Sequence, residues 1–257
     1  MKGVVFCGAL VLALATPALA DVCSNDPFAA YDDLSGTWSP CATPRGSLVT
    51  ESAYIQNASA VGGTNYAAYP MIDLRTGVFP RIEFAFHTPS QIAESGPRGI
   101  GLYPSTHLGY GLRYEAFDSS RLTVAVASDV LPPVSRFSPN NAQSRYVFGV
   151  TSLYEVTQRV SLGIASSGTS SGTVGFQHVL PSAALRAGYI FGSSTELSSD
   201  VGSRFPARTS GPQSYSDVAV DQLLTGKLFL KAGAGTTFNE AIGSKAHYLA
   251  AGFNYRP

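Results

Sequence analysis

The sequence is poor in charged residues. Only 13% of its 257 residues are charged, and 17 basic side chains balance 17 acidic ones. Soluble globular domains carry roughly a quarter charged residues, so this chain has too few to coat a soluble surface. A net charge of zero and the lack of any Lys or Arg run exclude nucleic acid as a partner. Disorder over the whole length is also excluded, because 44% of residues are hydrophobic and 11% aromatic.

Long apolar runs are equally scarce, and the one present lies at the start of the chain. Lys2 gives a positive beginning, residues 4–15 are almost wholly apolar, and residues 18–20 read Ala-Leu-Ala. This pattern is typical of a secretory signal peptide and is too short to span a bilayer. We therefore predict that residues 1–20 are removed and that the mature chain is exported.

Cysteine is rare, and only Cys23 and Cys41 remain in the mature chain. An even number of cysteines in an oxidising compartment predicts a disulfide, here closing a loop of about 19 residues. The alternative, a metal or redox pair, lacks C-x-x-C spacing and a nearby histidine. We expect no metal and no cofactor.

From Gly46 onward, segments of about ten residues alternate between apolar and polar side chains. In a strand, successive side chains point to opposite faces, so each such segment has one apolar side. Residues 107–117 show the pattern well. One face carries Leu108, Tyr110, Leu112, Tyr114 and Ala116; the other carries His107, Gly109, Gly111, Arg113 and Glu115.

Short and long connections alternate along this region. The short ones are residues 77–80, 117–120, 156–158, 192–195 and 224–226, and the long ones are residues 57–65, 89–106, 131–144, 166–180, 206–214 and 239–245. Up-and-down barrels of outer membranes have this arrangement, with tight periplasmic turns and longer external loops. We predict an all-β chain: a single up-and-down antiparallel transmembrane β-barrel of about twelve strands at residues 46–257, after an N-terminal periplasmic segment at residues 21–45. The alternative is a secreted soluble sandwich or barrel.

Three short motifs carry a family resemblance. They are Thr43-Pro44-Arg45-Gly46 followed by Glu51, residues 73–77 (DLRTG) followed by Arg81-Ile82-Glu83, and residues 252–256 (GFNYR). Together they resemble the outer-membrane transporter family grouped with phenol meta-pathway degradation proteins. The resemblance implies an outer-membrane barrel that helps small, often aromatic or hydrophobic, molecules across. It also implies contact with outer-membrane lipid and, during insertion, with the barrel-assembly machinery. The chain departs from the family by ending in Pro257 rather than an aromatic residue.

Charged side chains on the polar faces are candidates for the lumen lining. Both signs are balanced among them, so little ion selectivity is expected, and the alternative role is a lattice of salt bridges that holds the barrel round. The candidates are Asp73, Arg75, Arg81, Glu83, Arg113, Glu115, Arg121, Asp129, Arg145, Glu155, Arg159, Arg186, Asp217, Asp221 and Lys231. Candidates for a solute mouth are Phe86, Leu102, Tyr103 and Phe137, for which the alternative is the ordinary aromatic girdle of a barrel.

Catalytic signals are weak. Residues 168–172 fit G-x-S-x-G, but that motif needs a strand before it and a helix after it, whereas here it lies in a Ser/Gly-rich stretch expected to be a loop. The four histidines lack the spacing of metal ligands. We therefore predict no enzyme, but a channel or transporter for small solutes in a bacterial outer membrane. The alternative is a structural or adhesive membrane barrel with a closed lumen, and a soluble secreted protein is a third reading.

Overall fold

The computed structural model describes residues 22–32, 38–59, 65–88, 91–96, 99–104, 108–132, 144–171, 179–204, 213–239 and 244–257. The expected signal peptide and Phe137 lie outside these residues. Within them, one short helix, α1 (Val22–Asn25), precedes a chain of strands. No helix of the described residues is long and apolar enough to cross a membrane.

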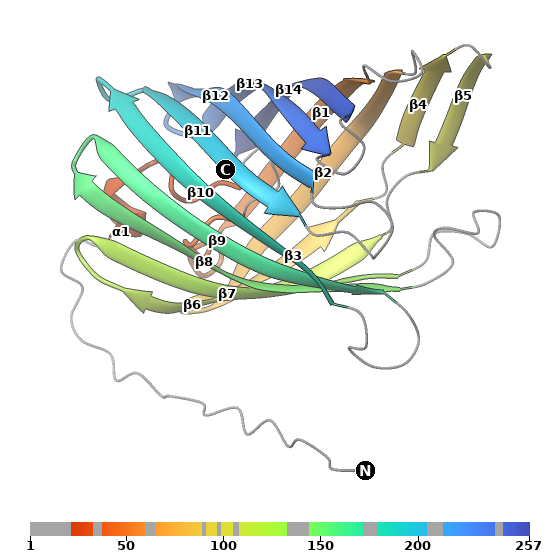
Figure 1. Ribbon diagram of the computed structural model, residues 1–257. Coiled ribbons are helices and arrows are strands. Elements are labelled where there is room, and N and C mark those ends of the chain that lie inside the picture. The colour runs from red at the N-terminus through yellow and green to blue at the C-terminus, as the bar shows by residue number, and fades with distance from the viewer. Residues whose placement is uncertain are drawn as a thin grey trace.

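The strands form one antiparallel sheet that closes on itself. They are β1 (Leu48–Ser59), β2 (Asn65–Phe79), β3 (Ile82–His87), β4 (Gln91–Gly96), β5 (Gly99–Pro104), β6 (Gly109–Asp118), β7 (Leu122–Leu131), β8 (Arg145–Thr157), β9 (Val160–Ser171), β10 (Val179–Phe191), β11 (Thr195–Arg204), β12 (Gln213–Thr225), β13 (Leu228–Asn239) and β14 (Ser244–Tyr255). Strand β1 pairs with both β2 and β14, which closes the ring (Figure 1). The predicted barrel of twelve strands is confirmed, since only β4 and β5 stand outside the ring.

Strands β4 and β5 form a hairpin that the sequence did not predict. The stretch 89–106 was expected to be a long connection. Instead, β5 pairs with β4, and β4 pairs with residues 65–69 of β2, beyond residues 73–79 of β2 that pair with β3. The expected loop at residues 166–180 is likewise shorter, because β9 continues to Ser171. In both cases backbone pairing with a neighbouring strand extends the sheet into polar sequence, where side-chain hydrophobicity gives no signal.

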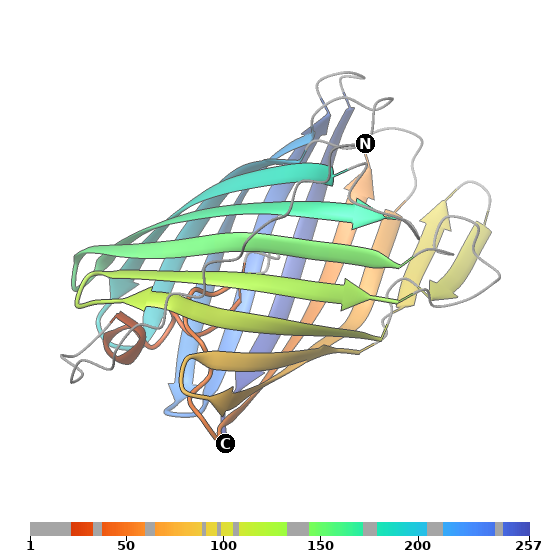
Figure 2. The same cartoon turned by 90° about the horizontal axis from the view of Figure 1, so that it is seen from below.

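The two ends of the barrel differ. Five tight turns, at residues 80–81, 119–121, 158–159, 192–194 and 226–227, lie together at one end with the C-terminus, and we call this the short-turn end. Hairpin β4–β5 lies at the other, which we call the long-loop end (Figure 2). The alternation of short and long connections in the sequence is therefore a real division between two ends.

The strands expose their apolar face outward. Leu112, Leu185 and Leu249 are 55%, 60% and 61% exposed, whereas Arg113 and Glu115 are only 4% and 7% exposed. This is the reverse of a soluble protein, in which large apolar side chains gather inside. A barrel with apolar surface outside and charge inside is suited to a surrounding of lipid.

The described N-terminal segment, residues 22–32 and 38–47, packs inside the barrel. Phe28 and Tyr31 contact Phe229 of β13, with ring centroids 5.5 and 4.4 Å apart. Helix α1 packs against β7 and β8. An apolar core thus forms between this segment and the inward face of the wall near the short-turn end.

Candidate functional site in the barrel lumen

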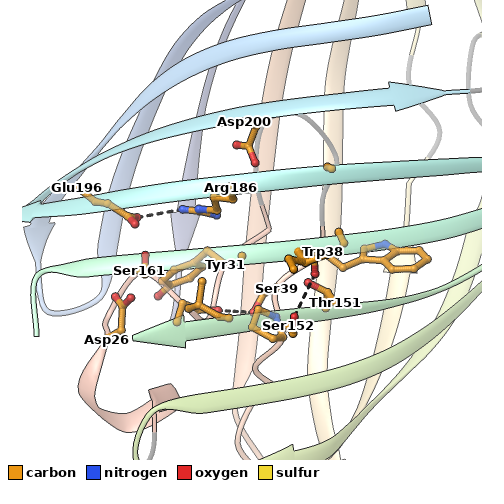
Figure 3. Close-up of a pocket in the computed structure, with 17 residues that line it drawn as sticks. Asp26, Tyr31, Trp38, Ser39, Thr151, Ser152, Ser161, Arg186, Glu196 and Asp200 are labelled. Carbon is orange, nitrogen blue, oxygen red and sulfur yellow. Dashed lines mark hydrogen bonds and ion pairs between the residues drawn. The ribbon is translucent and has the colours of Figure 1, made fainter. Parts of the chain in front are cut away.

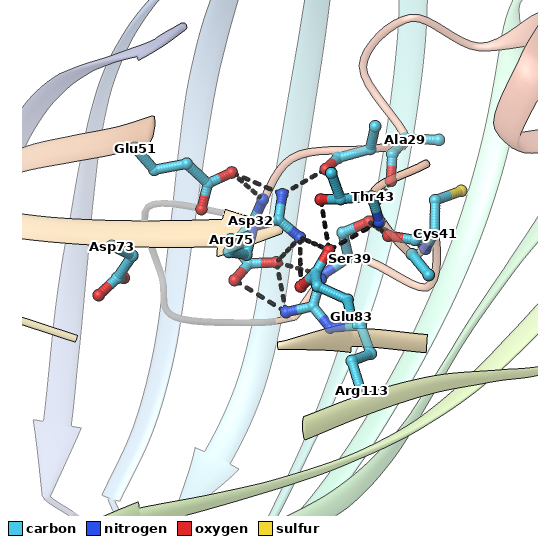
Figure 4. Close-up of polar contacts among 12 residues, drawn as sticks. Ala29, Asp32, Ser39, Cys41, Thr43, Glu51, Asp73, Arg75, Glu83 and Arg113 are labelled. Atoms are coloured by element: carbon cyan, nitrogen blue, oxygen red, sulfur yellow. Dashed lines mark hydrogen bonds and ion pairs between the residues drawn. The ribbon is translucent and has the colours of Figure 1, made fainter. Parts of the chain in front are cut away.

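The N-terminal segment is held in the lumen by buried ion pairs centred on Arg75 of β2 (Figure 4). The Asp32 carboxylate of the segment lies between two wall cations: its Oδ1 is 3.6 Å from Arg75 Nη1 and 3.0 Å from Arg113 Nη2. The Arg75 side chain is 1% exposed and that of Arg113 4%. Because both guanidinium groups are buried, they need the carboxylate as a counter-charge.

Two wall carboxylates complete the same group. Arg75 Nη2 lies 3.0 Å from Glu51 Oε1, and Arg75 Nη1 lies 3.2 Å from Glu83 Oε1. Glu83 also faces Arg113, at 3.5 Å. We call these five residues the Arg75 cluster. It joins β1, β2, β3 and β6 to the N-terminal segment.

Backbone groups of the segment bind the cluster as well. The Thr43 amide donates to Glu83 Oε2 at 2.7 Å, and the Asp32 amide donates to Glu51 Oε1 at 3.0 Å. Gly77 lets the segment pass close to the wall, because a Cβ there would lie 2.2 Å from the Thr43 carbonyl oxygen and 2.3 Å from that of Pro44. Two of the three short motifs behind the family resemblance, at residues 43–51 and 73–83, therefore meet in space and fix the segment to the wall.

Asp32 acts as a carboxylate in this position. Burial raises the pKa of the Asp32 carboxyl, but the charges of Arg113 and Arg75 outweigh burial, so its pKa lies below its ordinary value. The Lys231 ammonium of β13 also donates to the Asp32 carbonyl oxygen, at 2.5 Å. The segment is thus held by side chains from β2, β6 and β13.

The predicted disulfide is confirmed. Cys23 and Cys41 are bonded, with their Cα atoms 5.5 Å apart. Cys41 and Val22 pack with Leu153 of β8 in one buried cluster. The bond ties the two arms of the segment together inside the barrel, so the segment is held both to itself and to the wall.

Three cavities follow one another along the inner face of β8 to β11. An upper chamber of about 440 Å³ lies toward the long-loop end, and a vestibule of about 320 Å³ lies beside the turn at residues 158–159. Between them is a space of only about 20 Å³, which we call the constriction. The constriction shares Trp38 with the chamber and Asp26 with the vestibule.

The constriction lies between the N-terminal segment and the wall (Figure 3). Asp26 and Trp38 come from the segment, and Arg186, Glu196 and Asp200 come from β10 and β11. Arg186 Nη2 pairs with Glu196 Oε2 at 3.1 Å. A volume of this size holds about one water molecule, so the segment leaves little room against the wall between the chamber and the vestibule.

The upper chamber has a mixed lining. Trp38 forms part of it, and Gly149 of β8 leaves room for the indole, since a Cβ there would lie 2.8 Å from Trp38 Cζ3. Arg204 lies over the ring of Tyr215, 5.4 Å from its centroid, and both line the chamber. Ser167 and Ser182, whose hydroxyls are 2.5 Å apart, add polar surface. Aromatic, polar and cationic groups therefore surround one space.

The predicted lining residues divide between the lumen and the short-turn end. Arg81, Arg121 and Arg159 lie exposed in tight turns, and Arg81 reaches Glu115 at 3.6 Å. The others lie on strands, buried or half-buried: Asp73, Arg75, Glu83, Arg113, Glu115, Asp129, Arg145, Glu155, Arg186, Asp217, Asp221 and Lys231. Their part in a solute path remains a proposal.

The balance of charge expected from the sequence is not kept in the structure. Among the described residues, nine buried acidic side chains face three buried basic ones: Asp26, Glu51, Glu83, Glu115, Asp129, Glu196, Asp200, Asp217 and Asp221, against Arg75, Arg113 and Lys231. The sequence count could not separate wall positions from turn positions. The interior of this barrel is acidic.

The four mouth candidates are placed differently. Phe86 belongs to the outward set of β3, opposite Tyr110 of β6, because inward positions on that strand are held by Glu83 and Ala85. Leu102 and Tyr103 lie on β5, where only the backbone is described, and Phe137 lies outside the described residues.

Several residues of the site were not among the sequence candidates. Asp26, Asp32 and Trp38 precede the strands, so no alternation marked them, and Glu196 and Asp200 lie on a Ser-rich strand with a weak pattern. One signal was present: the chain's single tryptophan lies between the two bonded cysteines.

The G-x-S-x-G match is not a nucleophile elbow. Gly168, Ser170 and Ser171 lie within β9; the first two pair with both β8 and β10, and Ser171 pairs with β8. The motif requires a sharp turn from a strand into a helix, and the residues here continue the strand. The sequence argued against the elbow because the stretch was expected to be a loop. The stretch is a paired strand instead, and a paired strand also excludes the elbow.

No family model and no curated protein matches the sequence. Among solved structures, the chain is similar to the COG4313 outer membrane channel from Pseudomonas putida F1, with a TM-score of 0.66, 13% identity, and coverage of 84% of this chain and 97% of that one. It is also similar to the NanC porin (TM-score 0.53, 9% identity, 79% and 98% covered). A third match is the translocator domain of autotransporter NalP from Neisseria meningitidis (TM-score 0.51, 11% identity, 82% and 88% covered). The chain therefore has the fold of an outer-membrane β-barrel channel.

Proposed function

We propose that this protein is a channel of a bacterial outer membrane for small solutes, hydrophobic or aromatic ones among them. The observation that carries the proposal is the succession of upper chamber, constriction and vestibule through the barrel. The short-turn end faces the periplasm in this assignment, as in other outer-membrane barrels. A solute enters the chamber from outside and leaves through the vestibule.

The chamber supports a solute of modest size that carries an aromatic ring. Its volume falls within the range of small-molecule sites. Trp38 and Tyr215 offer aromatic surface, while Arg204 and the serine pair offer polar contacts. A molecule with one apolar ring and a polar group would contact both kinds of lining.

One observation favours the alternative of a closed barrel. The N-terminal segment leaves only about 20 Å³ in the constriction, room for about one water molecule, and buried ion pairs fix the segment. The two functions differ in what crosses the purified protein. Conductance in planar bilayers, together with uptake of a small aromatic by cells with and without the protein, separates them. If the folded protein gives no conductance and cells with and without it take up the aromatic equally, the barrel is closed.

Trp38→Ala is expected to raise single-channel conductance by about twofold or more, because the indole forms the boundary between chamber and constriction. The matched control is Tyr154→Ala, which removes an aromatic side chain from the outward face of β8. The control should conduct like the parent. Equal conductance of Trp38→Ala and the parent would place the path elsewhere in the lumen.

The channel is also expected to prefer cations to anions. Asp26, Glu196 and Asp200 give the constriction three acidic groups against the single cation Arg186, and fixed charge of one sign attracts ions of the other. The measurement is the reversal potential under a KCl gradient, with Asp200→Asn expected to reduce the preference. A preference for chloride in the parent would contradict this assignment.

A further inference from the structure

Basic side chains collect at the short-turn end. Within the described residues, six of them lie there, five exposed and Arg256 half-buried. No acidic residue is exposed among the short-turn-end residues whose side chains the structure describes; Glu115 is buried, and Asp118 and Glu155 are half-buried. We call this group the basic rim: Arg45, Arg81, Arg121, Arg159, Lys227 and Arg256.

The rim is built by a repeated backbone device. In each tight turn, the last residue before the next strand accepts a hydrogen bond through its backbone carbonyl. The donor is a backbone amide of the hairpin that follows in the chain. The bonds are Glu115 N to Arg81 O (2.9 Å), Glu155 N to Arg121 O (2.8 Å), Ile190 N to Arg159 O (2.8 Å), Leu223 N to Ser194 O (2.7 Å) and Arg256 N to Lys227 O (2.9 Å). Four of these five equivalent accepting positions are basic, and Ser194 is the exception.

Outward apolar side chains stand immediately beside the rim. Phe79 is 60% exposed, Phe117 49%, Phe191 51% and Tyr255 41%. Phe79 lies two residues before Arg81, and Tyr255 directly precedes Arg256. Aromatic side chains at such positions mark the boundary between hydrocarbon and headgroups. The basic groups therefore lie at the level of the lipid phosphates.

We propose that the basic rim is a binding surface for anionic phospholipid headgroups of the adjacent leaflet. Charge complementarity selects them: the rim exposes cations and no described acid, whereas the acidic groups of this end, such as Glu115 and Asp118, are withdrawn into the wall. Guanidinium groups bind phosphate oxygens through paired hydrogen bonds. The interaction fixes the depth of the barrel in the membrane.

Two variants test the rim in opposite directions. Arg45, Arg121 and Lys227 lie outside the three cavities, so R45Q/R121Q/K227Q removes rim charge without altering their linings. Ser194→Arg adds a base at the one turn that lacks it. Each base near an anionic surface contributes about fivefold in binding. Arg204→Gln, which removes an exposed base near the long-loop end, is the matched control.

The experiment measures retention of phosphatidylglycerol relative to phosphatidylcholine by native mass spectrometry of full-length protein, after heat-dependent gel mobility has shown that each variant is folded. The parent should retain phosphatidylglycerol in preference to phosphatidylcholine. This preference should fall at least about fivefold in the triple variant and should rise in Ser194→Arg. Arg204→Gln should match the parent. An unchanged preference in the triple variant would overturn the proposal. So would equal displacement of the lipid by millimolar inorganic phosphate, which would make the rim a site for soluble anions, or loss of preference in Arg204→Gln alone.

Discussion

Arg75→Met is expected to lower the free energy of unfolding by about 3–5 kcal/mol, the cost of removing one partner from a buried ion-pair group. Arg75 contacts Asp32, Glu51 and Glu83, and its side chain is 1% exposed. Methionine fills similar volume, so the loss comes from carboxylates left without their counter-charge. Urea unfolding measured by intrinsic fluorescence gives the value.

The single tryptophan makes the same experiment report on the N-terminal segment. Trp38 lies in the constriction, so release of the segment would change its emission while the barrel keeps its heat-dependent gel mobility. Arg121→Met, at an exposed rim position, is the control and should stay within about 0.5 kcal/mol of the parent. If Arg75→Met unfolds at the urea concentration of the parent, the cluster does not anchor the segment.

Leu185→Arg is expected to cost about 2–4 kcal/mol or to block membrane assembly, because it places a charge on the lipid face near the middle of a spanning strand. Leu185 is 60% exposed and lies centrally in β10. The neighbouring Ala184 is buried on the inward face. Ala184→Ser adds a polar group there and should assemble almost normally.

The comparison of these neighbours tests which face meets lipid. The measurement is the yield of folded barrel in lipid vesicles, followed by urea unfolding of the folded fraction. Normal assembly of Leu185→Arg, with failure of Ala184→Ser, would mean that the apolar outer face does not contact lipid. That result would favour a soluble barrel.

The sequence by itself determined the architecture, because a strand repeats every two residues and the repeat is local. Leu112 beside Arg113 already shows which side is apolar, and the low content of charge shows that the apolar side is the outer one. The alternation of connections then predicts the division between two ends. Each of these features can be read from residues that are neighbours in the chain.

Only the tertiary structure decided what the lumen contains. Asp32 and Arg113 lie 81 positions apart in the chain yet touch at 3.0 Å, and no local pattern records such a pair. The same holds for the sorting of charge: Arg121 and Asp129 look alike as polar positions, but one lies exposed in a turn and the other is buried in the wall. Long-range closure of the sheet placed nine acids in the interior and six of the bases on the rim, because it is closure that separates the inside of a barrel from its ends.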